Sequence, residues 1–209
     1  DVDNTNPRFA SAFMAMLDTS IASAALPVIQ GEIGATASEA TWIGTAYLTA
    51  EIIVLPLTGW FERILSTRRF LFVAATLFTI FSVVCGTATD LTTMIIGRLG
   101  QGFSGGMMIP TAFAMVAKLL PHDQHSKAIA ILSVPITFAP VLGPLLGGWL
   151  TENYSWHLAF FINVPFCIIL LALIVVAMPP SRGDMSEINR ADWAGVMGMH
   201  SCTRSCSSS

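Results

Sequence analysis

The sequence predicts an all-α integral membrane protein with six transmembrane helices. Of its 209 residues, 54% are hydrophobic and only 11% are charged, and the mean hydropathy is +0.68, whereas soluble domains carry roughly a quarter charged residues. The apolar residues come in blocks of about 20, enough for a helix to cross roughly 30 Å of hydrocarbon. The alternation typical of membrane strands is absent. A soluble helical core would need charged outer faces, which several of these blocks lack.

Six apolar blocks account for residues 9–178, and residues 1–8 precede them. The predicted spans are residues 9–29, 42–61, 70–88, 91–120, 127–150 and 157–178. Most connections between the blocks are short, which forces neighbouring helices to pack antiparallel. The sequence therefore predicts one bundle of six helices.

Charges between the blocks predict the orientation of the bundle. Basic residues lie between blocks two and three and after block six: Arg63, Arg68, Arg69, Arg182 and Arg190. The alternate loops carry acids and no Lys or Arg: Glu32, Glu39, Asp90 and Glu152. By the positive-inside rule, both ends of the chain are cytoplasmic, including the segment 1–8.

The sequence changes character after block six. Residues 179–192 are polar and rich in helix breakers, so they are predicted to form a cytoplasmic linker. Residues 193–199 (WAGVMGM) are typical of the start of a seventh helix, which stops in the Ser/Cys-rich residues 200–209. We expect native-like sequence to end at Met199 or His200, through truncation, frameshift or an engineered end. A genuine regulatory tail is the alternative.

Three charged residues lie inside the apolar blocks. Asp18 and Glu51 are each the tenth residue of their block, and Arg98 lies roughly 10 Å into block four. A charge at that depth costs a few kcal/mol, so it faces the bundle interior, finds a partner or changes its protonation state. Burial favours the neutral carboxyl group and a nearby arginine favours the carboxylate, so such a site can load and release a proton. Structural acids and a snorkelling arginine are the alternatives. Arg98 lies outward of the acids, so a direct ion pair is not assured.

Small residues and prolines shape two of the predicted helices. One face of block four carries Arg98, Gln101, Gly102 and Gly105. Their spacing of i, i+3, i+4 and i+7 places them on the same side of a helix. Block five carries a ridge of small residues beside two prolines: Ala139, Gly143 and Gly147, with Pro140 and Pro144. Small-xxx-small spacing favours close helix contact, and prolines bend membrane helices. Packing alone is the alternative explanation for either pattern.

Six segments together resemble the N-terminal half of a major facilitator superfamily transporter. More narrowly, they resemble the fourteen-spanner drug:proton antiporters of the EmrB/QacA type. The segments are LDTSIASAALP (17–27), GWFERILSTRR (59–69), residues 97–106, residues 139–148, WHLAFFINVPF (156–166) and DWAGVMGM (192–199), the last resembling the family's entry to helix seven. Four positions depart from the family pattern: Ser23 replaces asparagine, Arg63 aspartate, and Ser66 and Ala139 glycine. The change at Arg63 puts any gating ion pair built on that aspartate in question.

The resemblance implies efflux of lipophilic, often cationic compounds in exchange for protons across the plasma (bacterial inner) membrane. It implies that the proton gradient supplies the energy and that no cofactor is needed. It also implies that Asp18 and Glu51 are candidate proton or cation sites, with Arg98 as their charge partner. The transport-motif residues are Gly59, Arg63, Arg68, Arg69, Gln101, Gly102, Gly143, Pro144, Gly147 and Gly148. Candidate cavity residues are Trp42, Tyr47 and Phe113, although packing is the commoner use of aromatic residues. Expected partners are lipids and a periplasmic adaptor or second transporter half, with no nucleic acid.

The family mechanism rocks two six-helix bundles about a central site. This sequence predicts one bundle, so we expect the chain to fold but to transport only when a second half or a second copy completes the cavity. The competing function is a non-transporting membrane fragment that binds or modulates an intact transporter. An enzyme is not predicted, because no nucleophile and no metal-ligand set accompanies His122 and His125, which are expected to lie in a solvated loop.

Overall fold

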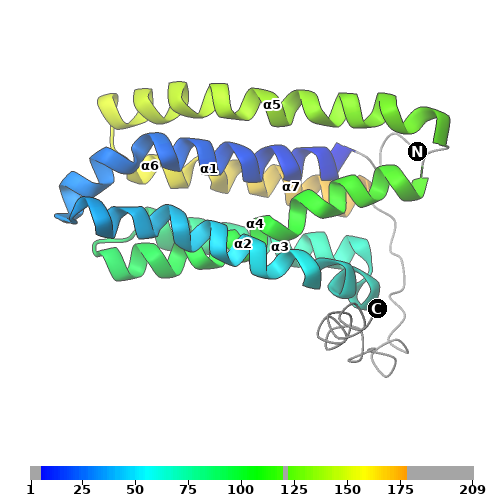
Figure 1. Cartoon of the computed structure of the whole chain (residues 1–209), viewed down its shortest axis with the longest axis horizontal. Coiled ribbons are helices and arrows are strands. Elements are labelled where there is room, and N and C mark those ends of the chain that lie inside the picture. Colours follow the sequence, from blue (N-terminus) through cyan, green and yellow to red (C-terminus); the bar gives the residue numbers. More distant parts are fainter. Residues whose placement is uncertain (1–5, 120–121, 178–209) are drawn as a thin grey trace, which may run out of the picture.

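A computed structural model describes residues 6–119 and 122–177 of the chain. Its helices run back and forth along one long axis (Figure 1). They are α1 (Asn6–Ile33), α2 (Ala37–Leu65), α3 (Thr67–Gly86), α4 (Leu91–Leu119), α5 (His122–Asn153), α6 (His157–Phe161) and α7 (Asn163–Ala177). Because α6 and α7 are separated only by Ile162, they form one pass. The prediction of an all-α bundle with six transmembrane helices is confirmed.

The helices have the composition of membrane spans. Within the described residues, four stretches are long and apolar enough to cross a bilayer: Ala10–Ile33, Ala37–Glu62, Thr67–Gly86 and His157–Val176. Their outer faces carry large apolar side chains such as Ile52 and Ile168, which are more than half exposed. Such side chains are stable on an outer surface when lipid tails surround them.

The turn between α1 and α2 is built from local signals in the sequence. Gly34 follows the last helical residue of α1 with a φ of +71°, and the backbone N–H of Ala35 donates to the Gln30 carbonyl at 3.1 Å. This geometry is the common glycine-terminated helix end. Thr36 and Glu39 then form a capping box, in which each side chain accepts a hydrogen bond from the other residue's backbone N–H.

The start of α4 carries a side-chain cap. Asp90 caps α4, since its carboxylate accepts hydrogen bonds from the backbone N–H and the hydroxyl of Thr93. Those bonds, the backbone one above all, hold the pKa of Asp90 below its usual value.

α5 begins at His122, earlier than predicted. His122 and His125 therefore lie on the first turns of a helix, and the prediction that they lie in a loop is wrong.

The last pass is broken at Ile162, between α6 and α7. Pro165 lies three residues beyond the break. Proline lacks an N–H and its ring clashes with the carbonyl four residues earlier, which here belongs to Phe161. The interruption falls where that clash is expected, and it makes Asn163 the first residue of α7.

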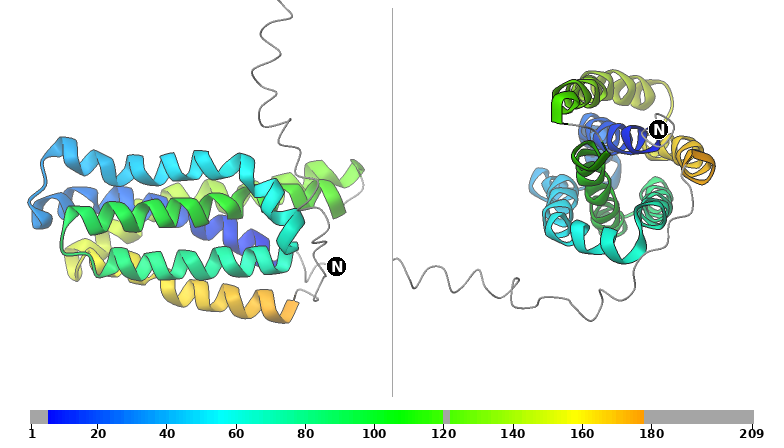
Figure 2. Two further views of the ribbon diagram at one scale, coloured as in Figure 1. Left: turned by 90° about the horizontal axis from the view of Figure 1, so that it is seen from below. Right: turned by 90° about the vertical axis from the view of Figure 1, so that its right-hand side faces the viewer.

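Two of the helices, α1 and α4, occupy the middle of the bundle, as the end-on view in Figure 2 shows. The most extensive packing joins α2 to α4 and α1 to α5. Glycines make these contacts close. A Cβ atom at Gly102 would lie 2.2 Å from the Tyr47 carbonyl oxygen on α2, and one at Gly143 would lie 2.1 Å from Ser20 Cβ on α1.

The interior consists of two apolar clusters, one toward each end of the bundle. One cluster includes Met14, Phe70, Phe78, Met107, Met108, Cys167, Leu170 and Ile174. The other includes Leu17, Ile21, Ile29, Ile43, Cys85, Met94, Trp156 and Phe160. On α3, α4 and α7 the sequence between the two sets carries buried polar residues. These polar residues form the candidate site.

Candidate functional site

An ion pair between α1 and α4 forms the centre of the site. Arg98 Nη1 lies 2.8 Å from Asp18 Oδ2, and the two side chains are 2% and 1% exposed. Among the described residues this is the one ion pair. Both charges are in the interior of a membrane protein, so each stabilises the other where water does not. The structure thus brings together two of the three charged residues predicted from the sequence.

Gln101 extends the ion pair into a network that reaches α3. It lies one turn from Arg98 on α4, and its Oε1 accepts a hydrogen bond from Arg98 Nη1 at 3.1 Å. Its Nε2 donates to Ser82 Oγ at 2.8 Å and to Asp18 Oδ1 at 3.4 Å, while Cys85 Sγ donates to its Oε1 at 3.3 Å. One buried amide therefore connects α1, α3 and α4.

Asn163 is a member of the network that the sequence reasoning missed. Its Nδ2 donates to Asp18 Oδ1 from the first residue of α7. The signal available in the sequence was an amide side chain two residues before a proline, inside an apolar block (FFINVPF). Asn163 follows the interruption at Ile162, and its side chain reaches across to Asp18 on α1.

Tyr47 completes the surroundings of Arg98 from α2. The Arg98 guanidinium carbon lies 4.4 Å from the centre of the Tyr47 ring, a cation–π arrangement. Tyr47 is 1% exposed, so in this conformation it supports Arg98 and does not line an open surface. An aromatic face therefore covers the guanidinium group, in addition to its carboxylate and amide acceptors.

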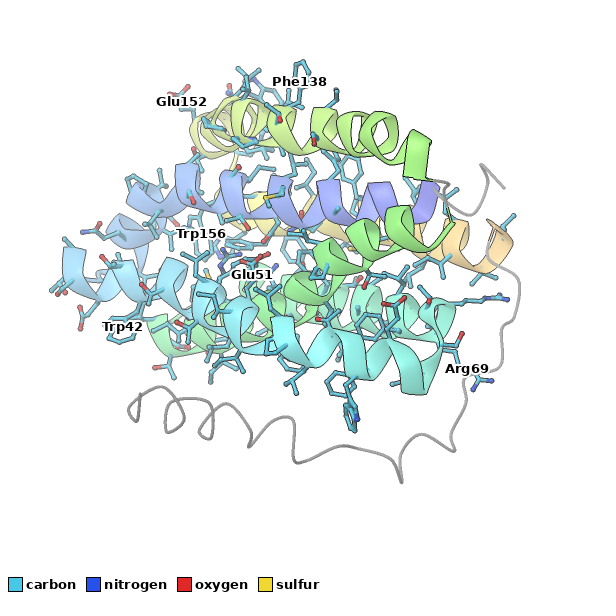
Figure 3. All side chains as sticks on the ribbon, turned by 45° about the vertical axis from the view of Figure 1, so that its right-hand side comes forward. Trp42, Glu51, Arg69, Phe138, Glu152 and Trp156 are labelled. Carbon is cyan, nitrogen blue, oxygen red and sulfur yellow. The ribbon has the colours of Figure 1, made fainter. Side chains whose placement is uncertain are left out.

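Glu51 lies apart from the network. It is half-buried on α2, one turn beyond Tyr47, and Figure 3 shows its side chain pointing into the bundle. Its Cα would be 2.9 Å from a Cβ atom at Gly106 on α4. Within the described part of the chain no hydrogen-bond partner of Glu51 is present, yet it lies within electrostatic reach of Arg98.

The remaining predicted residues fall into three groups. Gly102, Gly143 and Gly147 lie at close helix contacts, whereas Gly59 and Gly148 face open space. Arg68 and Arg69 lie at the start of α3. Trp42 is 60% exposed near the start of α2 (Figure 3), and Pro144 is exposed on α5. Arg63 and Phe113 belong to α2 and α4, but their side chains lie outside the described residues. Residues 179–209, with the predicted linker, seventh helix and tail, also lie outside them.

Chemically, the network can hold one carboxylate ionised in a water-poor interior. Three donors converge on Asp18: the Arg98 guanidinium and the amides of Gln101 and Asn163. Protonation of Asp18 removes the negative charge that balances the Arg98 guanidinium. The protonation state of Asp18 is therefore coupled to the position of the Arg98 side chain. No cluster of metal-ligating residues occurs in the described part of the chain.

Comparison with known proteins agrees with this geometry. The sequence model of the Major Facilitator Superfamily matches residues 8–196. The chain is 37% identical to the colistin resistance protein EmrB of Acinetobacter baumannii over 187 residues, which cover 90% of this chain and 36% of that protein. It is 39% identical to the multidrug export protein EmrB of Haemophilus influenzae over 178 residues, which cover 85% and 34%. The chain thus spans about a third of the length of these relatives.

The fold also matches that of solved transporters. The proton:xylose symporter XylE superimposes with a TM-score of 0.75 at 16% identity, over 94% of this chain and 48% of the symporter. At this identity the likeness concerns the fold alone. The six-pass bundle corresponds to about half of that transporter. The chain belongs to the Major Facilitator Superfamily.

Proposed function

We propose that this chain forms the N-terminal half of a proton-coupled multidrug exporter of the bacterial inner membrane. The observation that carries the proposal is the buried Asp18–Arg98 ion pair in the middle of the bundle. A structural role alone does not need a charge pair there, because apolar residues of similar volume are often as stable. Similarity to proteins named for multidrug export and colistin resistance supports efflux as the activity.

Asp18 is the proposed proton carrier. When it is ionised, Arg98, Gln101 and Asn163 satisfy its oxygens. When it is protonated, Arg98 becomes a buried cation that needs another carboxylate, and Glu51 is the acid that already lies within its electrostatic reach. Proton binding at Asp18 would therefore shift Arg98 toward Glu51, which couples protonation to a change in helix position.

Glu51 is the proposed contact for cationic substrates. It is half-buried, so it is more accessible than Asp18, and no described residue gives it a hydrogen bond. A lipophilic cation could pair with this carboxylate while its apolar part packs against neighbouring side chains. The energy source is the proton gradient, without a bound cofactor.

Transport requires a second bundle, because alternating access needs two bundles that move about a common site. The described residues form one bundle, so we propose that a second half or a second copy completes the cavity. In this arrangement the Arg68–Arg69 end and both chain ends face the cytoplasm. A periplasmic adaptor is a further proposed partner at the opposite end.

The experiment uses Asp18→Asn and Glu51→Gln in this chain joined to a C-terminal bundle, with Glu152→Gln as a matched control on an exposed acid. Drug-driven proton movement is measured in proteoliposomes with a pH-sensitive dye. We expect Asp18→Asn to abolish coupling, Glu51→Gln to reduce transport of cationic drugs, and the control to match the unmodified protein. Unchanged coupling in both variants would show that the carboxylates are structural.

The 209-residue chain alone gives a second test. Proton-coupled transport by a monomer of this chain would contradict the requirement for a second bundle. If the chain instead lowers the activity of a co-expressed full-length relative, with crosslinks between the two, the alternative function of a membrane modulator is favoured.

A further inference from the structure

A cavity lies at the outer surface of the bundle, between the start of α3 and the end of α7. Its volume is about 350 Å³. It is lined by Leu65, Arg68, Arg69, Phe72, Val73 and Val175. Figure 3 shows Arg69 at one end of the bundle, far from Glu51. The cavity is therefore separate from the Asp18–Arg98 site.

Arg68 is fixed in this cavity by the end of α7. Its Nη2 donates to the Val175 carbonyl oxygen at 3.0 Å. Val175 is among the last four residues of α7, whose carbonyls have no partner within the helix. A guanidinium group has five N–H donors, so this single bond orients Arg68 and leaves most of its donors for a ligand.

The cavity is lined by two positive charges and by no carboxylate. Arg68 and Arg69 are adjacent in the sequence and both line the cavity. Among the described residues, the one ion pair is that of Arg98 with Asp18. The lining contains no acid. A ligand with a net negative charge is therefore favoured over a zwitterionic ligand.

The other walls of the cavity are apolar and face the surroundings of the bundle. Phe72 and Val73 are about two-fifths exposed and Val175 is half exposed. Ile80 continues the exposed apolar surface of α3, and Val176 that of α7. In a membrane-spanning bundle such surfaces contact acyl chains, while arginines at the helix ends lie at headgroup depth.

We propose that this cavity is a binding site for an anionic phospholipid. Arg68 and Arg69 hold the phosphodiester group through paired N–H donors, the geometry in which guanidinium groups recognise phosphate. The acyl chains lie along Phe72, Val73 and Val175. The lipid joins the α2–α3 turn to the end of α7, two parts of the chain that are distant in sequence.

The test measures lipid retention by the purified 209-residue chain in detergent, by native mass spectrometry and thermal unfolding. Phosphatidylglycerol, phosphatidylcholine with the same acyl chains, and inorganic phosphate are the three probes. We expect phosphatidylglycerol to be retained and to raise the unfolding temperature more than phosphatidylcholine, and inorganic phosphate to have no effect. Stabilisation by inorganic phosphate alone, to the level of the lipid, would overturn the lipid assignment.

Variants locate the site. At about 1 kcal/mol per arginine, Arg69→Gln should weaken phosphatidylglycerol binding about fivefold and Arg68→Gln/Arg69→Gln about 25-fold, with binding of phosphatidylcholine unchanged. Glu152→Gln, at the opposite end of the bundle, should bind like the unmodified chain. Equal retention of phosphatidylglycerol by the double variant would overturn the proposal. If the double variant cannot be purified, Arg69→Gln decides, because Arg69 is exposed and no hydrogen bond from a described residue holds it.

Discussion

Asp18 and Arg98 stabilise each other in a place where neither would be stable alone. Both side chains are buried. Apart from Asp18, the groups that contact the Arg98 guanidinium are the uncharged Tyr47 ring and the Gln101 amide. Removing one member of a buried pair leaves an unpaired charge, whereas removing both leaves neutral groups. Together with the Asp18→Asn single variant, these two variants form a double-mutant cycle, and its departure from additivity measures the interaction.

Arg98→Gln should therefore destabilise the chain, by up to about 3–5 kcal/mol at a pH that keeps Asp18 ionised, because it leaves the Asp18 carboxylate without a counter-charge. Asp18→Asn/Arg98→Gln should recover a large part of that loss. The measurement is the free energy of unfolding in mixed micelles, followed by tryptophan fluorescence. A double variant no more stable than Arg98→Gln would mean that Asp18 does not depend on Arg98 in the folded protein.

The predictability of the site differs from residue to residue. Asp18, Glu51 and Arg98 could be found in the sequence because a charge inside an apolar block has few explanations. Asn163 and Ser82 could not, since uncharged polar residues are tolerated in membrane helices and many of them bond to their own backbone, as Thr79 does to Ala75. The contact of Asn163 with Asp18 also depends on the packing of α1 against α7, which is a property of the folded bundle.

At the scale of single elements, the join between α2 and α3 holds a backbone conformation that side chains rarely adopt. Ser66 is the C-cap of one helix and the N-cap of the next, with φ 66° and ψ 140°. Among the described non-glycine residues it alone has a positive φ. Transporters of the family that this segment resembles carry glycine at this position. Glycine adopts a positive φ without the steric cost of a Cβ atom.

Ser66→Gly should stabilise the chain by about 1 kcal/mol, the net of relieved backbone strain and the larger conformational freedom of glycine in the unfolded state. Ser66→Ala is the matched control, because it removes the hydroxyl and keeps the Cβ atom. The readout is the unfolding temperature in detergent. If Ser66→Ala gains as much as Ser66→Gly, the hydroxyl and not the backbone is the source of the effect.

Two glycines from predicted motifs should respond in opposite ways to the same substitution. A methyl group at Gly102 would collide with the Tyr47 backbone, which cannot move unless α2 moves, so Gly102→Ala should cost about 1–3 kcal/mol. A Cβ atom at Gly148 would have no heavy atom within 4 Å outside its own stretch of helix, and Gly148→Ala should change stability by no more than about 0.5 kcal/mol. Unfolding in mixed micelles compares the two. A neutral Gly102→Ala would show that α2 and α4 are not packed this closely.

For the molecule as a whole, the number of passes was predictable because bilayer thickness fixes the length of each apolar block. Which helices pack together was not, since apolar faces directed at lipid and at protein have similar composition in these blocks. The central positions of α1 and α4 follow from glycines and from the polar network, which act only once distant segments meet. The polar layer between two apolar clusters is likewise a property of the assembled bundle.

The orientation of the bundle follows from charge asymmetry and can be tested at its two ends. Arg69 and Glu152 are both exposed, and Figure 3 shows them at opposite ends of the helices. Cationic loops resist translocation, so the Arg69 end should remain in the cytoplasm. Cys85, Cys167, Cys202 and Cys206 are first replaced, and Arg69→Cys or Glu152→Cys is then introduced.

A membrane-impermeant maleimide should label the Glu152→Cys protein in intact cells and the Arg69→Cys protein only after permeabilisation. The reverse pattern would show that the basic end is outside. Labelling of both from one side would place the two ends of the long axis on the same side of the membrane, which six antiparallel spans do not allow.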